Sequence, residues 1–205
     1  MIDFDGRDLL IGIGILCILL PIIGWKKRSL SYLIFFSLFW VYLLAVVSVI
    51  IFPIVVNQES TDIVFAPSIN FIPFYLGNCF LLANLCLKSI VENIAITIPL
   101  GFGINFLVKI KPKNILWLAL GVGFVFELSQ LIISLIFRSG FRAIDINDVI
   151  LNSTGVLIGY GLFRLFAWLY LKISKFFDLK HKAIFADIYN IAIQAQADGI
   201  LKNID

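Results

Sequence analysis

Long apolar stretches alternate with short polar segments along the chain, and five of these stretches resemble membrane spans. A helix needs about 20 apolar residues to cross the roughly 30 Å of hydrocarbon in a bilayer. The stretches are Leu9–Trp25, Leu30–Val56, Ser89–Ile110, Ile115–Phe137 and Ile146–Ile173. The pattern predicts an all-α polytopic membrane helical bundle of about five transmembrane helices.

A sixth apolar stretch, Asn70–Leu87, is shorter and is interrupted by Pro73, Gly77 and Asn78. An interrupted stretch of this length favours an interfacial or re-entrant segment over a full span. We therefore predict a short external segment here and leave open which of the two forms it takes.

The C-terminal segment, Ala183–Asp205, places Ile184, Ile188 and Ile191 near one helical face. This spacing predicts an amphipathic helix that lies on the inner leaflet. A partner-binding or frayed tail is the alternative. We divide the chain into a membrane domain over residues 1–175 and a cytoplasmic tail over residues 176–205.

The composition agrees with a membrane protein, because 61% of the residues are hydrophobic and only 14% are charged. A soluble domain has about half apolar and a quarter charged residues. The one histidine, His181, excludes a histidine-rich metal site. We expect no metal, no cofactor and no nucleic-acid partner. We interpret the 20 phenylalanines as lipid-facing, and Cys17, Cys79 and Cys86 as packing residues.

Basic residues predict the orientation, since loops with excess Lys and Arg stay in the cytoplasm. With five spans, three basic groups fall on one side, and the opposite side holds few cations. The groups are Lys26, Lys27 and Arg28; Lys109, Lys111 and Lys113; and Lys172, Lys175, Lys180 and Lys182. We predict a multi-pass protein of the cell membrane with its N-terminus outside and its C-terminus inside.

A ladder of polar and small residues marks the start of the fifth span. Its members follow one another at spacings of three or four, so they share one helical face. They are Arg142, Asp145, Asp148, Asn152, Gly155 and Gly159. Acids and amides are costly in hydrocarbon and are expected where a bundle interior or a water-filled cavity accepts them. The ladder therefore predicts a site near the outer membrane surface.

Other spans carry polar residues at a matching depth. Glu127 and Gln130 share a face of the fourth span, with Glu127 close to the midplane. Glu92 and Asn93 lie near the outer end of the third span. Arg142 is the predicted counter-charge to the acids, and Glu127 is the predicted floor of the site.

Structural roles compete with each of these assignments. Asp148 and, less strongly, Asp145 are also candidates for capping the fifth helix. Asn105 and Gln130 are equally well interpreted as interhelical hydrogen-bonding residues. The Gly155-x-x-x-Gly159 pattern favours close helix packing over ligand binding.

Three ordered motifs carry a resemblance to a known family. They are Asn93-x5-Pro99-Leu100-Gly101, then Glu127-Leu128-Ser129-Gln130, then Arg142-x2-Asp145-x2-Asp148-x3-Asn152-x2-Gly155. The chain resembles the VanZ-like family of small bacterial membrane proteins, most strongly over residues 70–161. The resemblance implies a role in the bacterial envelope and a link to resistance against teicoplanin, a lipoglycopeptide antibiotic.

The favoured hypothesis is a binding protein with an outward-facing polar cleft. Its ligand would be a lipid-linked glycan, a peptidoglycan precursor or a lipoglycopeptide, held by its head group within the membrane lipids. The predicted binding residues are Asn93, Gln130, Arg142, Asp145, Asp148 and Asn152.

An enzyme is the alternative, since glycoside cleavage uses a protonated acid and an ionised partner. Glu127 would then be the acid, and Asp145 or Asp148 the base or nucleophile of an intramembrane hydrolase. A proton-coupled carrier is a third hypothesis. The absence of an evident inverted repeat in the sequence argues against the carrier.

Overall fold

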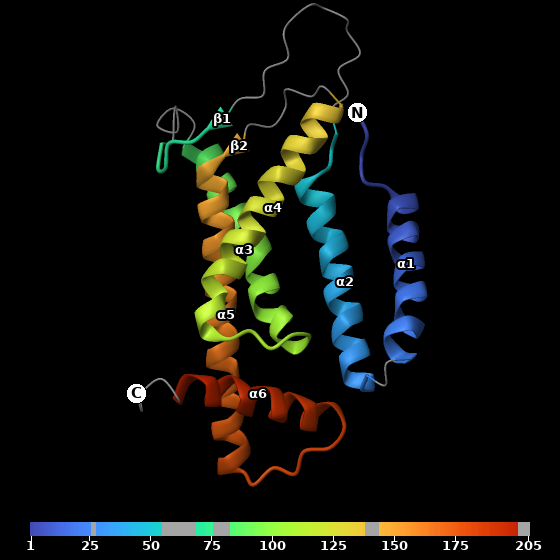
Figure 1. Cartoon of the computed structure of the whole chain (residues 1–205), viewed down its shortest axis with the longest axis vertical. Coiled ribbons are helices and arrows are strands. Elements are labelled where there is room, and N and C mark those ends of the chain that lie inside the picture. Colours follow the sequence, from blue (N-terminus) through green and yellow to red (C-terminus); the bar gives the residue numbers. More distant parts are fainter. Residues whose placement is uncertain (26–27, 55–68, 76–82, 138–143, 201–205) are drawn as a thin grey trace, which may run out of the picture.

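The computed structural model describes residues 1–25, 28–54, 69–75, 83–137 and 144–200. It is almost entirely helical, and five of its helices are long and apolar enough to cross a membrane. These are α1 (Gly6–Trp25), α2 (Leu30–Ile50), α3 (Ala83–Gly103), α4 (Ile115–Ile136) and α5 (Ile146–Phe176). Figure 1 shows them as a bundle of roughly upright rods. The five predicted spans and the all-α membrane fold are confirmed.

Two predicted spans differ from the helices by six or more residues at a boundary, and the other three by at most three residues. The second ends at Ile50 rather than Val56, because Pro53 has no N–H to continue the helix. The third begins at Ala83, six residues before Ser89, and gives way at Gly103 to a 3₁₀ turn, η2 (Ile104–Phe106).

The predicted external segment is partly a short strand pair. Its first residues belong to β1 (Ile69–Asn70), which pairs in parallel with β2 (Ile144–Asp145) at the start of α5. A turn follows, in which Phe74 has a positive φ of 62°. Ala83 and the residues after it belong to α3 instead, and residues 76–82 of the predicted segment lie outside the described ranges.

Helices α3, α4 and α5 form the tightest part of the bundle, with glycines where they meet. A Cβ added at Gly101 would collide with the backbone of Val156, and one at Gly155 with Thr97 and the carbonyl of Ile94. Only glycine allows backbones to approach this closely. The close-packing interpretation of Gly155 is thus confirmed.

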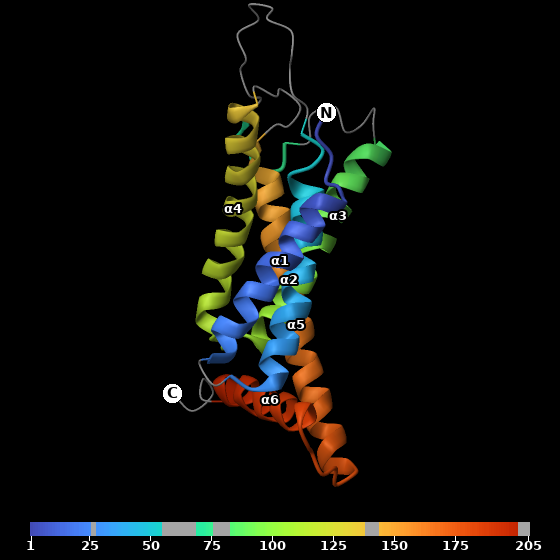
Figure 2. The same ribbon diagram turned by 90° about the vertical axis from the view of Figure 1, so that its right-hand side faces the viewer.

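The α1–α2 pair joins this unit through fewer contacts. The indole Nε1 of Trp40 donates to the carbonyl of Gly12 at 2.9 Å, which links α2 to α1. The hydroxyl of Tyr42 donates to the carbonyl of Ile96, which links α2 to α3. Helix α1 lies at the edge of the bundle in Figure 1 and nearest the viewer, in front of α2, in Figure 2.

Helix α6 (Ile184–Ile200) crosses the bundle at the end opposite the strand pair (Figure 1). It lies at the level of the α1–α2 connection, and α5 continues past it. A C-terminal helix over the predicted residues is therefore present, lying across the bundle rather than continuing α5.

Aromatic rings fill the bundle near α6, contrary to the interpretation of phenylalanine as lipid-facing. Phe102 and Phe106 of α3 and η2 contact Phe163 and Phe166 of α5, with ring centroids 5.6–6.3 Å apart. Composition does not reveal this cluster, because its members lie some 60 residues apart in the chain.

Candidate functional site

The candidate site lies at the end of the bundle that carries the strand pair. There the start of α5 packs beside α3, and the middle of α4 contacts the strand pair, whereas the last turns of α4 lean away from α5 (Figure 1). Asp145 is at its centre, as the last residue of β2 and the N-cap of α5.

The side chain of Asp145 is engaged in local structure. Its Oδ1 accepts from the backbone N–H of Asn147 at 2.8 Å, which caps the helix, and from the Nδ2 of Asn70 at 2.9 Å. An N-cap of this kind satisfies a backbone donor that the helix leaves unpaired. Asp145 therefore caps α5, a role for which the sequence had favoured Asp148.

Glu127 lies beneath this cap. It is buried in α4, with 3% of its surface exposed, and its Oε2 accepts from the backbone N–H of Asp145 at 3.1 Å. The motif on α4 and the ladder on α5 are therefore in direct contact. The predicted place of Glu127, under the acids of the ladder, agrees with this geometry.

Asp148 bonds across to α3 rather than capping α5. Its Oδ1 accepts from the Nδ2 of Asn93 at 2.7 Å. The side chain is half-buried. This bond connects the first and third motifs of the sequence, so Asn93 and Asp148 form one part of the site.

Asn152 lies one turn further along α5, with only 2% of its surface exposed. Its Oδ1 accepts no hydrogen bond from the part of the chain that the structure describes. A buried amide oxygen without a donor costs about 1–3 kcal/mol. Such an atom is an available acceptor for the donor of a ligand or a water.

Asn147 is a member of the site that the sequence analysis missed. Its Oδ1 accepts from the N–H of Phe74 at 2.6 Å, and its Nδ2 donates to the carbonyl of Tyr75 at 3.0 Å. It holds the external turn against α5. Asn147 lies off the ladder face, so periodicity alone does not identify it.

Other predicted residues have different places. Glu92 points outward, with 59% of its side chain exposed, and pairs with Lys88 at 3.7 Å. Gln130 is half-buried on α4, one turn from Glu127. Arg142, the predicted counter-charge, lies outside the described residues. The Nδ2 of Asn105, in η2, donates to the carbonyl of Gly101 in the adjoining α3 at 2.7 Å, which is a local bond rather than one between neighbouring spans.

Cys86 corrects the interpretation of all cysteines as packing residues. It lies near the start of α3 and is disulfide-bonded. Cys17, by contrast, is free and exposed on α1.

The site as a whole is rich in oxygen acceptors. Three carboxylates and the free Oδ1 of Asn152 gather around the start of α5. Hydroxyl, amide N–H and ammonium groups are the donors that such oxygens bind. Among the described residues, no group of three His, Cys, Asp or Glu side chains is arranged to hold a metal ion.

Comparison with known families agrees with the motifs. The model of the VanZ/LLP1 family matches residues 39–167, from the middle of α2 to the last third of α5. This range contains every site residue described above. No curated protein and no solved structure matches the chain.

Proposed function

The chain belongs to the VanZ/LLP1 family of membrane proteins, and we propose that it binds the polar head group of a lipid-linked envelope molecule. The ligand class is a lipid-linked glycan or peptide, or a lipoglycopeptide such as teicoplanin. The site at the start of α5 is the binding site, and it faces the outside of the cell. The bound tail lies among the membrane lipids.

One observation carries this proposal: the buried Oδ1 of Asn152, which has no donor among the described residues, follows the half-buried carboxylate of Asp148 on α5. The two residues are one turn apart, about 6 Å along the helix axis. A sugar or peptide head group presents several O–H and N–H donors at such separations. Burial strengthens these bonds, because water does not compete for the acceptors.

The outward orientation has two lines of support. The Lys and Arg residues gather at the other end of the bundle, which the positive-inside rule assigns to the cytoplasm. In addition, disulfides persist in oxidising surroundings, and the disulfide-bonded Cys86 is close to the site along α3.

An intramembrane hydrolase is the second candidate, favoured by the burial of Glu127 next to Asp145. Asp145 is engaged as the helix cap, so Asp148 is the better choice for an ionised base or nucleophile. Glu127 would supply the proton to the leaving group.

Lipidomics of the purified protein tests the binding proposal. We expect a lipid-linked sugar or lipopeptide to accompany the wild type and to be depleted at least tenfold in Asp148→Asn and Asn152→Leu. Glu92→Gln is the matched control, because Glu92 is an exposed carboxylate on the same end of α3. Equal ligand content in all four proteins would refute a head-group site.

The same samples separate binding from hydrolysis. Glu127→Gln keeps an oxygen that can accept the N–H of Asp145, so the fold is expected to survive. Accumulation of an intact ligand in Glu127→Gln, with a cleaved ligand in the wild type, would identify an enzyme. The same intact ligand in both would identify a binding protein.

A further inference from the structure

A cavity lies beneath α6, towards the end of the bundle opposite the candidate site. It has a volume of about 140 Å³ and is an open pocket lined by η2, the chain that follows it, α5 and α6. One water molecule needs roughly 15 Å³ of such volume, so the space admits a small polar group. On α5 the cavity begins at Tyr160, which follows Asn152 of the candidate site by eight residues, about 12 Å along the helix axis.

Both polar side chains and aromatic rings line this cavity. Lys109, Tyr160 and Gln194, whose side chains carry hydrogen-bond donors, line it together with Phe106 and Phe163. No acidic side chain is among the described residues that line it. The cavity therefore favours an anion, whereas the carboxylates of the outer site favour donors.

Helix α6 is fixed to α5 as one wall of the cavity. The guanidinium of Arg164 on α5 donates to the carbonyl of Ala195 on α6, and the Nε2 of Gln196 donates back to the carbonyl of Arg164 at 3.1 Å. At its other end, the ring of His181 stacks on that of Tyr189 with centroids 4.5 Å apart. These contacts preorganise the wall, so a ligand does not have to order it.

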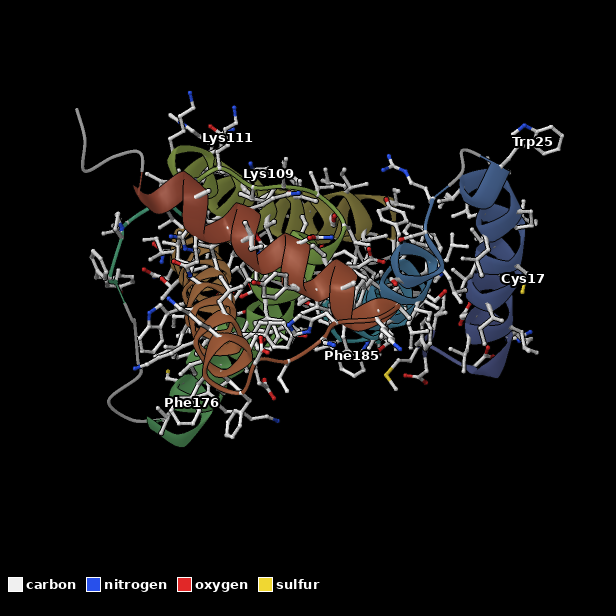
Figure 3. The ribbon with its side chains drawn as sticks, turned by 90° about the horizontal axis from the view of Figure 1, so that it is seen from below. Cys17, Trp25, Lys109, Lys111, Phe176 and Phe185 are labelled. Atoms are coloured by element: carbon white, nitrogen blue, oxygen red, sulfur yellow. The ribbon has the colours of Figure 1, made fainter. Side chains whose placement is uncertain are left out.

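Three lysines of the α3–α4 connection lie at or near the cavity in the sequence, and Lys109 lines it. Lys109 and Lys111 lie beside the C-terminal half of α6 when the bundle is seen from below (Figure 3). Lys113 follows them in the same α3–α4 connection and is exposed. Basic pockets at the cytoplasmic ends of membrane helices are typical binding places for anionic lipid head groups.

We propose that the cavity formed by η2, α5 and α6 binds the phosphate of an anionic lipid from the inner leaflet. Lys109 pairs with the phosphate, Tyr160 and Gln194 donate hydrogen bonds to it, and the acyl chains lie along the exposed apolar surface of the bundle. This site is independent of the outer head-group site and of any ligand bound there.

Native mass spectrometry tests the proposal on the full chain released from nanodiscs of mixed phosphatidylglycerol and phosphatidylcholine. A lysine near a membrane surface contributes about 1 kcal/mol to such binding. We therefore expect Lys109→Gln to retain about fivefold less phosphatidylglycerol than the wild type. Tyr160→Phe is expected to lower retention as well, and phosphatidylcholine retention to stay unchanged.

Lys113→Gln is the matched control, since it removes the same charge from the same connection without touching the cavity. Equal loss in Lys109→Gln and Lys113→Gln would mean diffuse attraction and would overturn the site. A parallel arm adds inorganic phosphate to protein in neutral detergent. Stabilisation of the wild type by phosphate, without selective retention of phosphatidylglycerol, would overturn the lipid as the source.

Discussion

The α1–α2 pair and the α3–α4–α5 unit are both made of long apolar helices, yet they are held in different ways. Helix α1 buries only Gly12 and Leu16, whereas α5 buries ten of its 31 residues. Glycines in the α3–α5 contact face backbone atoms directly, while Gly12 faces the flexible end of Leu44.

This difference teaches that apolar length alone does not create a helix–helix interface in a membrane. Lipid tails are as apolar as leucine, so association depends on close packing and on hydrogen bonds between helices. The α3–α4–α5 unit has both and carries the site. The family match begins within α2 and so leaves α1 out, as expected if α1 is peripheral.

Gly155→Ala is expected to have the largest effect on stability, because Gly155 lies in the close contact between α3 and α5. The added Cβ meets Thr97 and the carbonyl of Ile94, and backbone atoms cannot move aside without separating α3 from α5. We expect a loss of about 3 kcal/mol, seen as a clearly lower midpoint of thermal unfolding in detergent.

Two other glycines serve as controls for that experiment. Gly161→Ala has open space around the new methyl group and should be neutral or stabilising by up to about 1 kcal/mol. Gly12→Ala meets only Leu44, which can change rotamer, and should cost less than Gly155→Ala. A similar loss for Gly12→Ala and Gly155→Ala would contradict the comparison.

Asp145→Ala tests the start of α5 in the α3–α4–α5 unit, with a smaller expected effect on stability. It removes the cap of α5 and the bond from Asn70, so we expect about 1–2 kcal/mol of destabilisation. Hydrogen exchange should rise in the first turn of α5 and in β1. Asp145→Asn, which can still cap the helix, should keep most of the stability; equal damage by both substitutions would show that capping is not the role of Asp145.

Trp40→Phe is expected to have the smallest effect on stability, and it tests how weakly α1 is attached to α2. It deletes the bond to the carbonyl of Gly12, and interhelical bonds of this kind are worth about 0.6 kcal/mol. We expect a shift of that size in thermal unfolding. Trp117→Phe is the control, since Trp117 is 74% exposed. A loss of several kcal/mol in Trp40→Phe alone would mean that α1 belongs to the stable unit.

Much of the fold could be predicted from the sequence because membrane spans depend on local composition. The five spans and the helical C-terminal segment follow from runs of apolar residues and from periodicity. The boundaries were less accurate, since helix ends depend on caps and turns. Leu30–Val56, for example, was too long because it ran through Pro53.

The candidate site was predicted in outline but not in its pairings. Spacing placed Asp145, Asp148 and Asn152 on one face and indicated that Glu127 lies beneath them. It did not indicate that Asp145 caps the helix while Asp148 binds Asn93, nor that Asn147 holds the external turn. The side chains of Glu92 and Asn93 are adjacent in sequence, yet one faces outward and the other faces the site.

The sequence by itself determined that this is a membrane protein of five long helices with polar side chains gathered at one end. Hydrophobicity and periodicity act within a single helix, so they can be recognised without knowing any partner. Only the tertiary structure decided which acids are engaged in the fold, which acceptor remains available on Asn152, and where α6 lines a cavity. These depend on the rotation of each helix about its axis, which close contacts at Gly101 and Gly155 determine.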